Sequence, residues 1–438
     1  MLSFLALAML ITFMTLIVTG RASPLVALVL TPIAFAVIGG FGAELGPMMV
    51  MGVQRLAPIG VMLCFAILYF SIMSDAGLFD PLIHWIVKIV GHDPVLITMG
   101  SAVLALLVSL DGDGSTTYII CSSAMLPLYR RLGLNPLILA CLLTLSCAIT
   151  NITPWGGPTA RVASALKLDP ADVFLPLVPS MLAGAIFVIG LAYLLGRRER
   201  KRLAQSSGEG SRDDVIGEAA LAPTSSAGKN LRRPKLVLFN LMLTLALLVA
   251  LVMGLIALPV LFIVATAIAL LINYPSLEIQ TERLMAHAPN VIRVIGLVFA
   301  SGIFVGILEG TGMTSALADS VVHALPAQLG PYLAPITSVL AMPSSFFMTN
   351  TAFFFGVVPV LSEMAANYGT TSAEMARVAL LDGGVHFLSP LTPSTYLLAS
   401  LVGVEFAKHQ RYTLPWALAL WSVMLIAAMF TGAVSLPH

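Results

Sequence analysis

Long apolar runs, separated by short polar breaks, occupy most of this chain. Several runs, such as residues 2–20, 24–40, 59–73 and 173–196, have the length and polarity needed to cross the hydrocarbon core of a bilayer, about 30 Å thick, as helices. The runs do not alternate polar with apolar residues, as the strands of a membrane barrel do. The pattern therefore predicts an all-α polytopic membrane protein. The expected crossings cover residues 2–19, 24–42, 57–74, 136–160, 173–196, 236–254, 258–273, 290–308, 375–400 and 413–432.

One long polar segment, residues 197–235, interrupts this pattern. It is rich in Ser, Gly and Ala and basic at both ends, so we expect a flexible cytoplasmic linker. The linker would join an N-terminal membrane repeat, residues 1–196, to a C-terminal repeat, residues 236–438. With the linker inside, Arg21, Lys88, Arg130 and Arg131 of the N-terminal repeat fall inside and only its Arg55 and Lys167 fall outside, which agrees with the positive-inside rule.

Each repeat then has five crossings. Because five is an odd number, the two repeats must have opposite orientations in the membrane, which is the inverted-repeat plan of secondary transporters. A loose similarity between residues 72–87 and 307–322 supports the repeat.

Four polar interruptions fall inside otherwise apolar stretches, two in each repeat. They are DGDGSTTY (111–118), NITPWGGPTAR (151–161), MPSSFFMTNTAFFF (342–355) and LSPLTPSTY (388–396). We expect the first and third to lie in re-entrant hairpins, about 94–127 and 333–362, and the other two to be unwound helices. Irregular backbone at membrane depth is tolerated only where protein or a water-filled cavity surrounds it, so paired interruptions predict a substrate site. The alternative is that each is an ordinary turn at the membrane surface.

Composition narrows the class further. Of the 438 residues, 58% are hydrophobic and 10% are charged, and the mean hydropathy of +0.98 is far above that of soluble globular proteins. We expect no nucleic-acid partner, although the net charge of +1 is itself uninformative, because in a membrane protein the placement of the basic residues matters more. No nucleophile elbow, P-loop, HExxH or dinucleotide motif is present, so we do not expect an enzyme. The four cysteines lack metal or disulfide spacing, and no permanently bound cofactor is expected.

Small hydroxyl and amide side chains at the interruptions suit a bound carboxylate, and half-helix N-termini add unpaired N–H groups. Arg161 could pair with a carboxylate through two hydrogen bonds, whereas an arginine that snorkels from a helix end is the alternative. The candidate substrate-binding residues are Ser115, Thr116, Thr117, Asn151, Thr153, Gly156, Gly157, Thr159, Arg161, Asn350, Thr351, Ser389, Thr392, Ser394 and Thr395.

Asp111 and Asp113 stand beside this expected anion site, where ionised carboxylates would repel an anionic substrate. A proton on one aspartate or a divalent cation removes the conflict, because hard cations bind carboxylate and hydroxyl oxygens together. Asp382 and His386, one helical turn apart, are a candidate proton relay. The alternatives are a solvated surface turn for the first two aspartates and a packed, neutral histidine bonded to Asp382.

The motifs SLDGDGSTTY, NITPWGGPTARVASAL and LSPLTPSTYLLASLVGVE together resemble the bacterial CitMHS family, symporters of metal–citrate complexes with protons in the ion transporter superfamily. The resemblance covers nearly the full chain and departs from the family mainly in the linker. It implies import of citrate with a divalent co-substrate, Mg²⁺ or Ca²⁺, and with H⁺ across the bacterial inner (cytoplasmic) membrane. It also implies a lipid-embedded homodimer with an elevator-type fold, in which a transport domain carrying the hairpins and unwound helices moves against a scaffold domain.

Other functions remain open on the residues alone. One is a sodium-coupled di- or tricarboxylate carrier of the same superfamily. Another is a cation/proton antiporter, in which Asp111 and Asp113 would carry the ions. A channel or membrane scaffold without coupled transport is the alternative from a different class.

Overall fold

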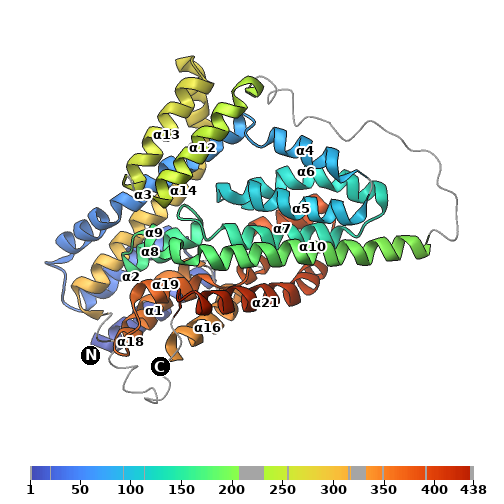
Figure 1. The fold of residues 1–438 in the computed structure, drawn as a ribbon. Coiled ribbons are helices and arrows are strands. Elements are labelled where there is room, and N and C mark those ends of the chain that lie inside the picture. Colours follow the sequence, from blue (N-terminus) through green and yellow to red (C-terminus); the bar gives the residue numbers. More distant parts are fainter. Residues whose placement is uncertain are drawn as a thin grey trace.

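Every regular element in the described part of the chain is a helix (Figure 1). The computed structural model describes residues 2–19, 21–91, 93–112, 114–206, 231–253, 256–313, 316, 332–347, 350–389 and 392–434. The all-α class predicted from the sequence is confirmed for these residues. Most of the predicted linker, residues 207–230, lies outside the described residues.

The first half of the chain runs from α1 to α10. Its elements are α1 (Leu2–Val18), α2 (Pro24–Ile38), α3 (Leu45–Asp75), α4 (Asp80–Val90), α5 (Pro94–Val108), η1 (Ser109–Asp111), α6 (Gly114–Leu132), α7 (Pro136–Thr150), α8 (Gly157–Leu166), α9 (Pro170–Phe174), η2 (Leu175–Leu177) and α10 (Val178–Ser206).

The second half runs from η4 to α21. Its elements are η4 (Pro234–Leu236), α12 (Val237–Val252), α13 (Leu258–Asn273), α14 (Leu277–Gly310), α16 (Leu333–Phe347), α17 (Asn350–Ala352), the π-helix η6 (Phe353–Val357), α18 (Val358–Ala366), α19 (Ser372–Leu380), η7 (Val385–Leu388), α20 (Pro393–Val402) and α21 (Phe406–Phe430).

Three helices of the first half begin with the same local signal, a capping Asp or Asn side chain followed by proline. The carboxylate or amide oxygens of Asp93, Asn135 and Asp169 accept the backbone N–H two residues later, at 2.9, 3.0 and 2.8 Å. The proline that follows each cap loses nothing at the first helical position, because the N–H there has no partner within the helix. Helices α5, α7 and α9 therefore start where the sequence places this signal.

The two halves repeat one order of elements. Each has two apolar helices, then a long helix (α3, α14), a helical hairpin (α5–α6, α16–α18), a helix pair interrupted by irregular backbone (α7–α8, α19–α20) and a long final helix (α10, α21). The first break in such a pair, 151–156, falls within a polar interruption of the sequence, whereas the second, 381–392, begins seven residues before the interruption at 388–396.

The long helices α3 and α14 pack against each other in antiparallel orientation. Gly52 faces Gly302, and a Cβ atom on Gly52 would lie only 2.0 Å from the Gly302 carbonyl oxygen. Farther along, Oδ2 of Asp75 lies 2.7 Å from Nε2 of His287, so rising numbers on α3 meet falling numbers on α14. Glycine allows the two backbones to touch, as small residues do between membrane helices.

A second packed region surrounds α10, which lies on α5, α7 and α21 (Figure 1). Its core includes Leu139, Leu142 and Leu143 of α7 and Leu420 of α21, all fully buried. Because α10 belongs to the first half and α21 to the second, this region joins the two halves.

Five described helical segments are long and apolar enough to cross a membrane: 45–75, 170–205, 234–251, 277–310 and 406–430. Shorter apolar helices, among them α1, α2, α7 and α13, occupy other predicted crossings, and α5 is the first arm of the predicted hairpin 94–127. The sequence placed the starts of α3 and α14 too late, at residues 57 and 290. Both helices continue through an internal proline, Pro58 and Pro289, and extend toward their N-termini into more polar residues.

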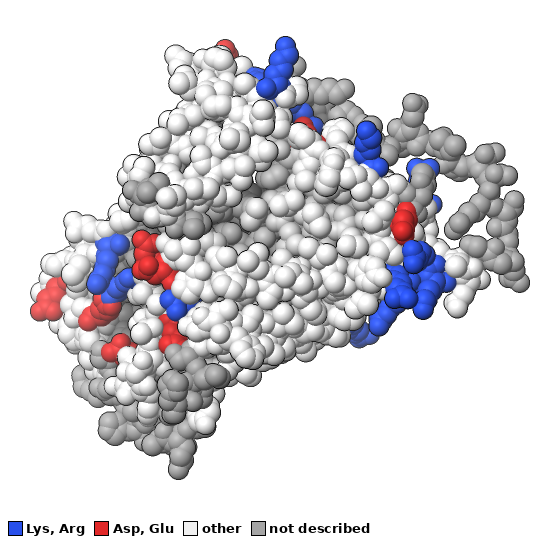
Figure 2. Space-filling model, viewed as in Figure 1, with Lys and Arg blue, Asp and Glu red and all other residues white. Residues whose placement is uncertain are grey.

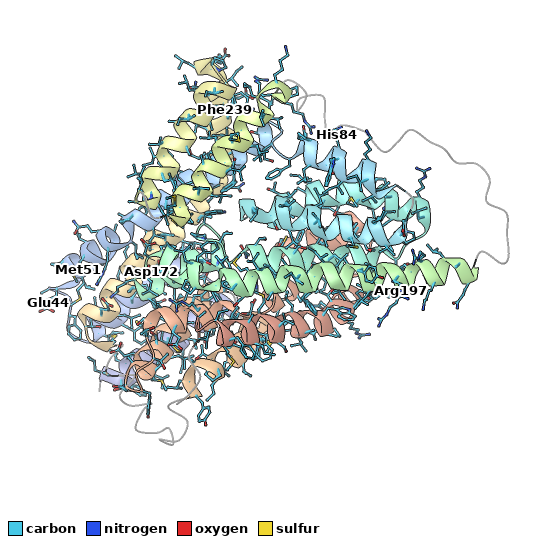
Figure 3. All side chains as sticks on the ribbon, viewed as in Figure 1. Glu44, Met51, His84, Asp172, Arg197 and Phe239 are labelled. Carbon is cyan, nitrogen blue, oxygen red and sulfur yellow. The ribbon has the colours of Figure 1, made fainter. Side chains whose placement is uncertain are left out.

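The charged residues gather at opposite ends of α10. A basic group lies at its C-terminal end, where the sequence reads RRERKR, and Figure 3 places Arg197 there (Figures 2 and 3). Glu44 and Asp172 lie at the opposite end of the molecule in Figure 3. A helix of 29 residues is about 44 Å long, which exceeds the hydrocarbon core. The two ends of α10 therefore fit opposite faces of a membrane.

Candidate functional site

The first helix break lies between Thr150, the last residue of α7, and Gly157, the first of α8. The backbone folds back on itself here, and a Cβ atom on Gly156 would lie 2.0 Å from the Asn151 carbonyl oxygen. Only glycine fits such a close approach. The Thr159 hydroxyl donates to the Ile152 carbonyl at 2.9 Å, which satisfies an acceptor freed by the break.

The second break lies between Leu380 of α19 and Pro393 of α20. Gly383 and Gly384 both have positive φ, 61° and 84°, a region that side chains disfavour. Asp382 holds this turn, because its Oδ1 accepts the Gly384 N–H at 2.9 Å. The two consecutive glycines thus turn the chain so that Asp382 and His386 face the same space.

Several hydroxyls of the second break bond to backbone carbonyls. Thr392 donates to the His386 carbonyl at 2.7 Å, and Thr395 donates to that of Phe387. Ser389 donates to the Phe346 carbonyl at 2.7 Å, which ties the break to the end of hairpin helix α16. These predicted substrate ligands therefore serve the freed backbone here, and each oxygen keeps acceptor capacity.

A cavity joins the two breaks. The total empty space of this cavity, including the part that is open to solvent, is about 250 Å³. Most of this space is too narrow for a solvent molecule, so the cavity has room for only about one water. Its polar wall combines residues from the first break, the second hairpin and the second break. The lining residues are Ala148, Asn151, Ile152, Pro158, Asn350, Phe354, Ala379, Leu380, Asp382 and His386.

A buried polar network crosses this cavity. Nδ1 of His386 lies 2.7 Å from Oδ2 of Asp382, and both residues are only 7% exposed. Nε2 of the same imidazole lies 3.4 Å from Nδ2 of Asn151. When Nδ1–H donates to Asp382, Nε2 accepts from the Asn151 amide, so the neutral imidazole satisfies both neighbours. The network thus couples a titratable pair of the second half to an amide of the first.

Two polar side chains near the first break lack such partners. The Thr153 hydroxyl is buried and has no hydrogen-bond partner among the described residues. The Arg161 guanidinium lies beside the start of α8, where a Cβ on Gly157 would be 2.9 Å from Nη1. Within the described part of the chain, no acceptor or carboxylate bonds to it. Buried polar groups are normally paired, so the buried Thr153 hydroxyl and the half-buried Arg161 guanidinium are both suited to a polar ligand.

Hairpin α16–α18 contributes Asn350 and Phe354 to the cavity wall. Phe354 belongs to the π-helix η6, an irregular helix type that occurs often at functional sites. Asn350 and Phe354 therefore place an irregular segment directly against the polar network.

The comparisons with known proteins agree on one family. A family model described as citrate transporter, CitMHS, matches residues 3–381. The chain belongs to the CitMHS citrate transporter family. A citrate transporter of Bacillus subtilis (strain 168) is 52% identical over 435 residues, which is 99% of this chain and 100% of the relative. A Mg(2+)/citrate complex secondary transporter of the same organism is 47% identical over the whole of both chains.

Among solved structures, the chain is similar to the YdaH transporter of Alcanivorax borkumensis, whose topology is described as unusual. The TM-score is 0.63 at 15% identity, and the match covers 90% of this chain and 89% of the other. This likeness shows the fold alone. The family and its relatives are transporters and not enzymes, so the sequence predictions of family and of a non-enzymatic, multi-pass membrane protein are confirmed.

In this citrate transporter family member, four of the predicted site residues meet at the cavity: Asn151, Asn350, Asp382 and His386. Ser115, Thr116 and Thr117 occupy the first turn of α6 and are not in its wall. The side chain of Asp111 and the whole of Asp113 lie outside the described residues. Among the described residues, no three His, Cys, Asp or Glu side chains form a metal-binding group.

Sequence reasoning missed Trp155. Its buried indole N–H donates to the Leu110 carbonyl at 2.8 Å and so ties the first hairpin tip to the first break. The ring packs against Phe70 of α3 and Phe262 of α13, with centroids 5.1 and 5.4 Å away. A tryptophan inside a polar interruption was the available signal, because a buried indole N–H needs an acceptor.

Proposed function

We propose that the chain imports citrate, as a complex with a divalent cation, in symport with protons. One observation carries the proposal: a single cavity brings Asn151 of one half together with the Asp382–His386 pair of the other. The printed name of the 47% identical relative, a Mg(2+)/citrate complex secondary transporter, supports the metal–citrate cargo.

The substrate carboxylates would bind near the first break. Arg161 would take one carboxylate, since its guanidinium has no partner among the described residues and can form two parallel hydrogen bonds. Thr153 and the amides of Asn151 and Asn350 would complete the polar contacts. The divalent cation, Mg²⁺ or Ca²⁺, enters with citrate as cargo, because both ions prefer carboxylate and hydroxyl oxygens. Its charge lowers the repulsion between an anionic substrate and acidic side chains.

The proton would reside on the Asp382–His386 pair. Protonation of Nε2 turns the histidine from an acceptor into a donor toward Asn151 and the cavity. A doubly protonated imidazole beside Asp382 then presents an N–H to the substrate carboxylate, whereas the neutral form does not. Asp111 and Asp113 remain candidates for handling protons or the cation at the first hairpin.

Transport would require the cavity to open, because space for about one water molecule is too small for citrate. The repeated element order and the antiparallel pairing of α3 with α14 support two inverted repeats. We propose an elevator movement in which the hairpins and broken helices form a transport domain that slides against a scaffold containing α3 and α14. A homodimer in the bacterial inner membrane completes this proposal.

Uptake of radiolabelled citrate into proteoliposomes tests it. An imposed proton gradient, acid outside, should drive accumulation with Mg²⁺ or Ca²⁺ present, and excess EDTA should reduce uptake to that of empty liposomes. Equal uptake with EDTA would contradict the metal complex. Accumulation that follows a sodium gradient instead would indicate the sodium-coupled carrier, and collapse of the pH gradient on adding cation without citrate would indicate an antiporter.

A further inference from the structure

Lys167 has an unusual backbone conformation for its residue type. It is the one non-glycine residue of the described chain with positive φ, at 57°, and it ends helix α8. Glycine is the usual residue at this position, because it has no Cβ to clash in the left-handed region. A lysine at this position, despite that energetic cost, indicates that its side chain has a specific role.

The ammonium of Lys167 contacts Glu309 of α14. Arg55 of α3 approaches the same carboxylate, with Nη1 3.5 Å from Oε2. The Lys167 side chain is largely buried at 13% exposure, whereas Arg55 and Glu309 are 57% and 42% exposed. Burial, and to a lesser extent the charge of Arg55, lowers the pKa of Lys167 to about 8, while the negative charge of Glu363 acts in the opposite direction. The ammonium is therefore charged near neutral pH. Two cations therefore hold one resident carboxylate.

Arg55 and Lys167 line an open cavity whose space, counted together with the part open to solvent, is about 610 Å³, compared with about 250 Å³ for the one between the helix breaks. The cavity lies between α3, the start of α13 and the turn that joins α8 to α9. Asp169 also lines it, but one of its carboxylate oxygens accepts the Ala171 N–H at 2.8 Å as a helix cap. A smaller cavity that shares Arg55 and Lys167 reaches Glu309 and Met51.

This cavity and the proposed substrate site lie at opposite ends of helix α8. Helix α8 has ten residues and is about 15 Å long, with Pro158 in the wall of the substrate cavity and Lys167 at the other end. Met51, labelled in Figure 3, lies at the end of the molecule opposite Arg197. Since the basic end of α10 is expected inside, Arg55 and Lys167 face the outside.

We propose that Arg55 and Lys167 form a carboxylate-capture site at the outer opening, in which Glu309 holds the cations until a substrate carboxylate displaces it. The inference rests on the proposed function, since its ligand is the same polycarboxylate cargo. Glu309 already shows that the two cations accept a carboxylate. Its exposure lets water solvate it once displaced, so the exchange leaves no buried charge unpaired.

The same ion pairs could instead have a purely structural role and connect the end of α8 to the α3–α14 pair. The two roles predict opposite effects of removing Glu309. In a capture site Glu309 competes with the substrate carboxylate for Arg55 and Lys167, so removing Glu309 should raise the affinity for substrate. A structural ion pair is broken by the loss of either partner, so removing Glu309 and removing the Lys167 charge would have the same effect on citrate uptake.

Initial rates of citrate uptake into right-side-out membrane vesicles, at fixed Mg²⁺ and pH, separate these roles. For the capture site, Lys167→Met and Arg55→Gln should each raise KM about threefold or more, whereas Glu309→Gln should lower it by a similar factor. The maximal rate should change less than twofold. An increase in KM for Glu309→Gln, or a fall in its maximal rate that matches Lys167→Met, would overturn the proposal.

Two control variants separate charge from folding. Lys167→Gly removes the ammonium but relieves the backbone strain, so it should raise KM as Lys167→Met does. A wild-type KM for Lys167→Gly would refute the role of the charge. Arg200→Gln removes a cation of similar exposure, 56%, at the opposite end of the molecule and should leave KM unchanged. Absence of citrate uptake by the wild type would defeat the proposed function itself, whereas the wrong variant pattern defeats only the capture site.

Discussion

The substitution His386→Gln tests whether the buried pair carries the transported proton. Glutamine can still form hydrogen bonds but does not titrate. The change removes the 2.7 Å bond between Nδ1 and Asp382, and a hydrogen bond to a charged group contributes about 1.5–3 kcal/mol. Asp382 keeps the Gly384 N–H at 2.9 Å, so the carboxylate retains a partner and we expect the variant to fold.

The size of the effect follows from the energy in a proton gradient. One pH unit corresponds to about 1.36 kcal/mol per proton, which sustains at most about tenfold accumulation if one proton moves with each complex. With two units imposed, the wild type should approach about 100-fold accumulation, and His386→Gln should stop near equal concentrations. Citrate–citrate exchange needs no net proton movement, so it should continue in the variant.

Both quantities are measured in one proteoliposome preparation, as gradient-driven accumulation and as exchange of labelled for unlabelled citrate. His409→Gln is the matched control, because His409 is also buried but contacts Thr144 and Thr413, at 3.2 and 3.1 Å, away from the cavity. It should accumulate citrate as the wild type does. Wild-type accumulation by His386→Gln would refute the assignment of the proton to this pair.

Two further substitutions test the first break. Arg161→Gln should raise KM for citrate about 10- to 100-fold in initial-rate measurements, because a charged hydrogen-bonding partner is lost, and Arg161→Lys should recover only part of it. An unchanged KM would show that Arg161 does not bind substrate. Trp155→Phe keeps an aromatic ring beside Phe70 but leaves the Leu110 carbonyl without its donor, so unfolding in detergent should require about 1–3 kcal/mol less free energy. Wild-type stability would mean that the indole bond contributes nothing.

The helix pattern could largely be predicted from the sequence, with errors at the starts of α3 and α14. Helix α13 spans Leu258–Asn273, the predicted range. Helices α3 and α14 start 12 and 13 residues before the predicted crossings at 57–74 and 290–308, and each contains an internal proline. Both continue through it, as packed apolar helices do where neighbouring groups take over the lost hydrogen bond.

The candidate site was only partly predictable. Asn151, Asp382 and His386 stood out because polar side chains in apolar segments need partners, and the structure brings them together. The hydroxyls were ambiguous for a physical reason. Thr159 and Thr392 look the same in sequence whether they face a ligand or a freed carbonyl, and only the fold shows that both bond to backbone of their own break.

The two ends of the α3–α14 pair are fastened differently, and this difference bears on movement. At one end Asp75 of α3 bonds to His287 of α14, a contact within the pair. At the other end Glu309 of α14 approaches Arg55 of α3 and also contacts Lys167, which belongs to the turn after the helix that carries Arg161. A sliding movement of α8 against this pair would leave the Asp75 contact intact but must separate Lys167 from Glu309. The cation that leaves Glu309 then needs another carboxylate, and a captured substrate supplies one, so capture at the outer opening would favour the movement that carries it inward.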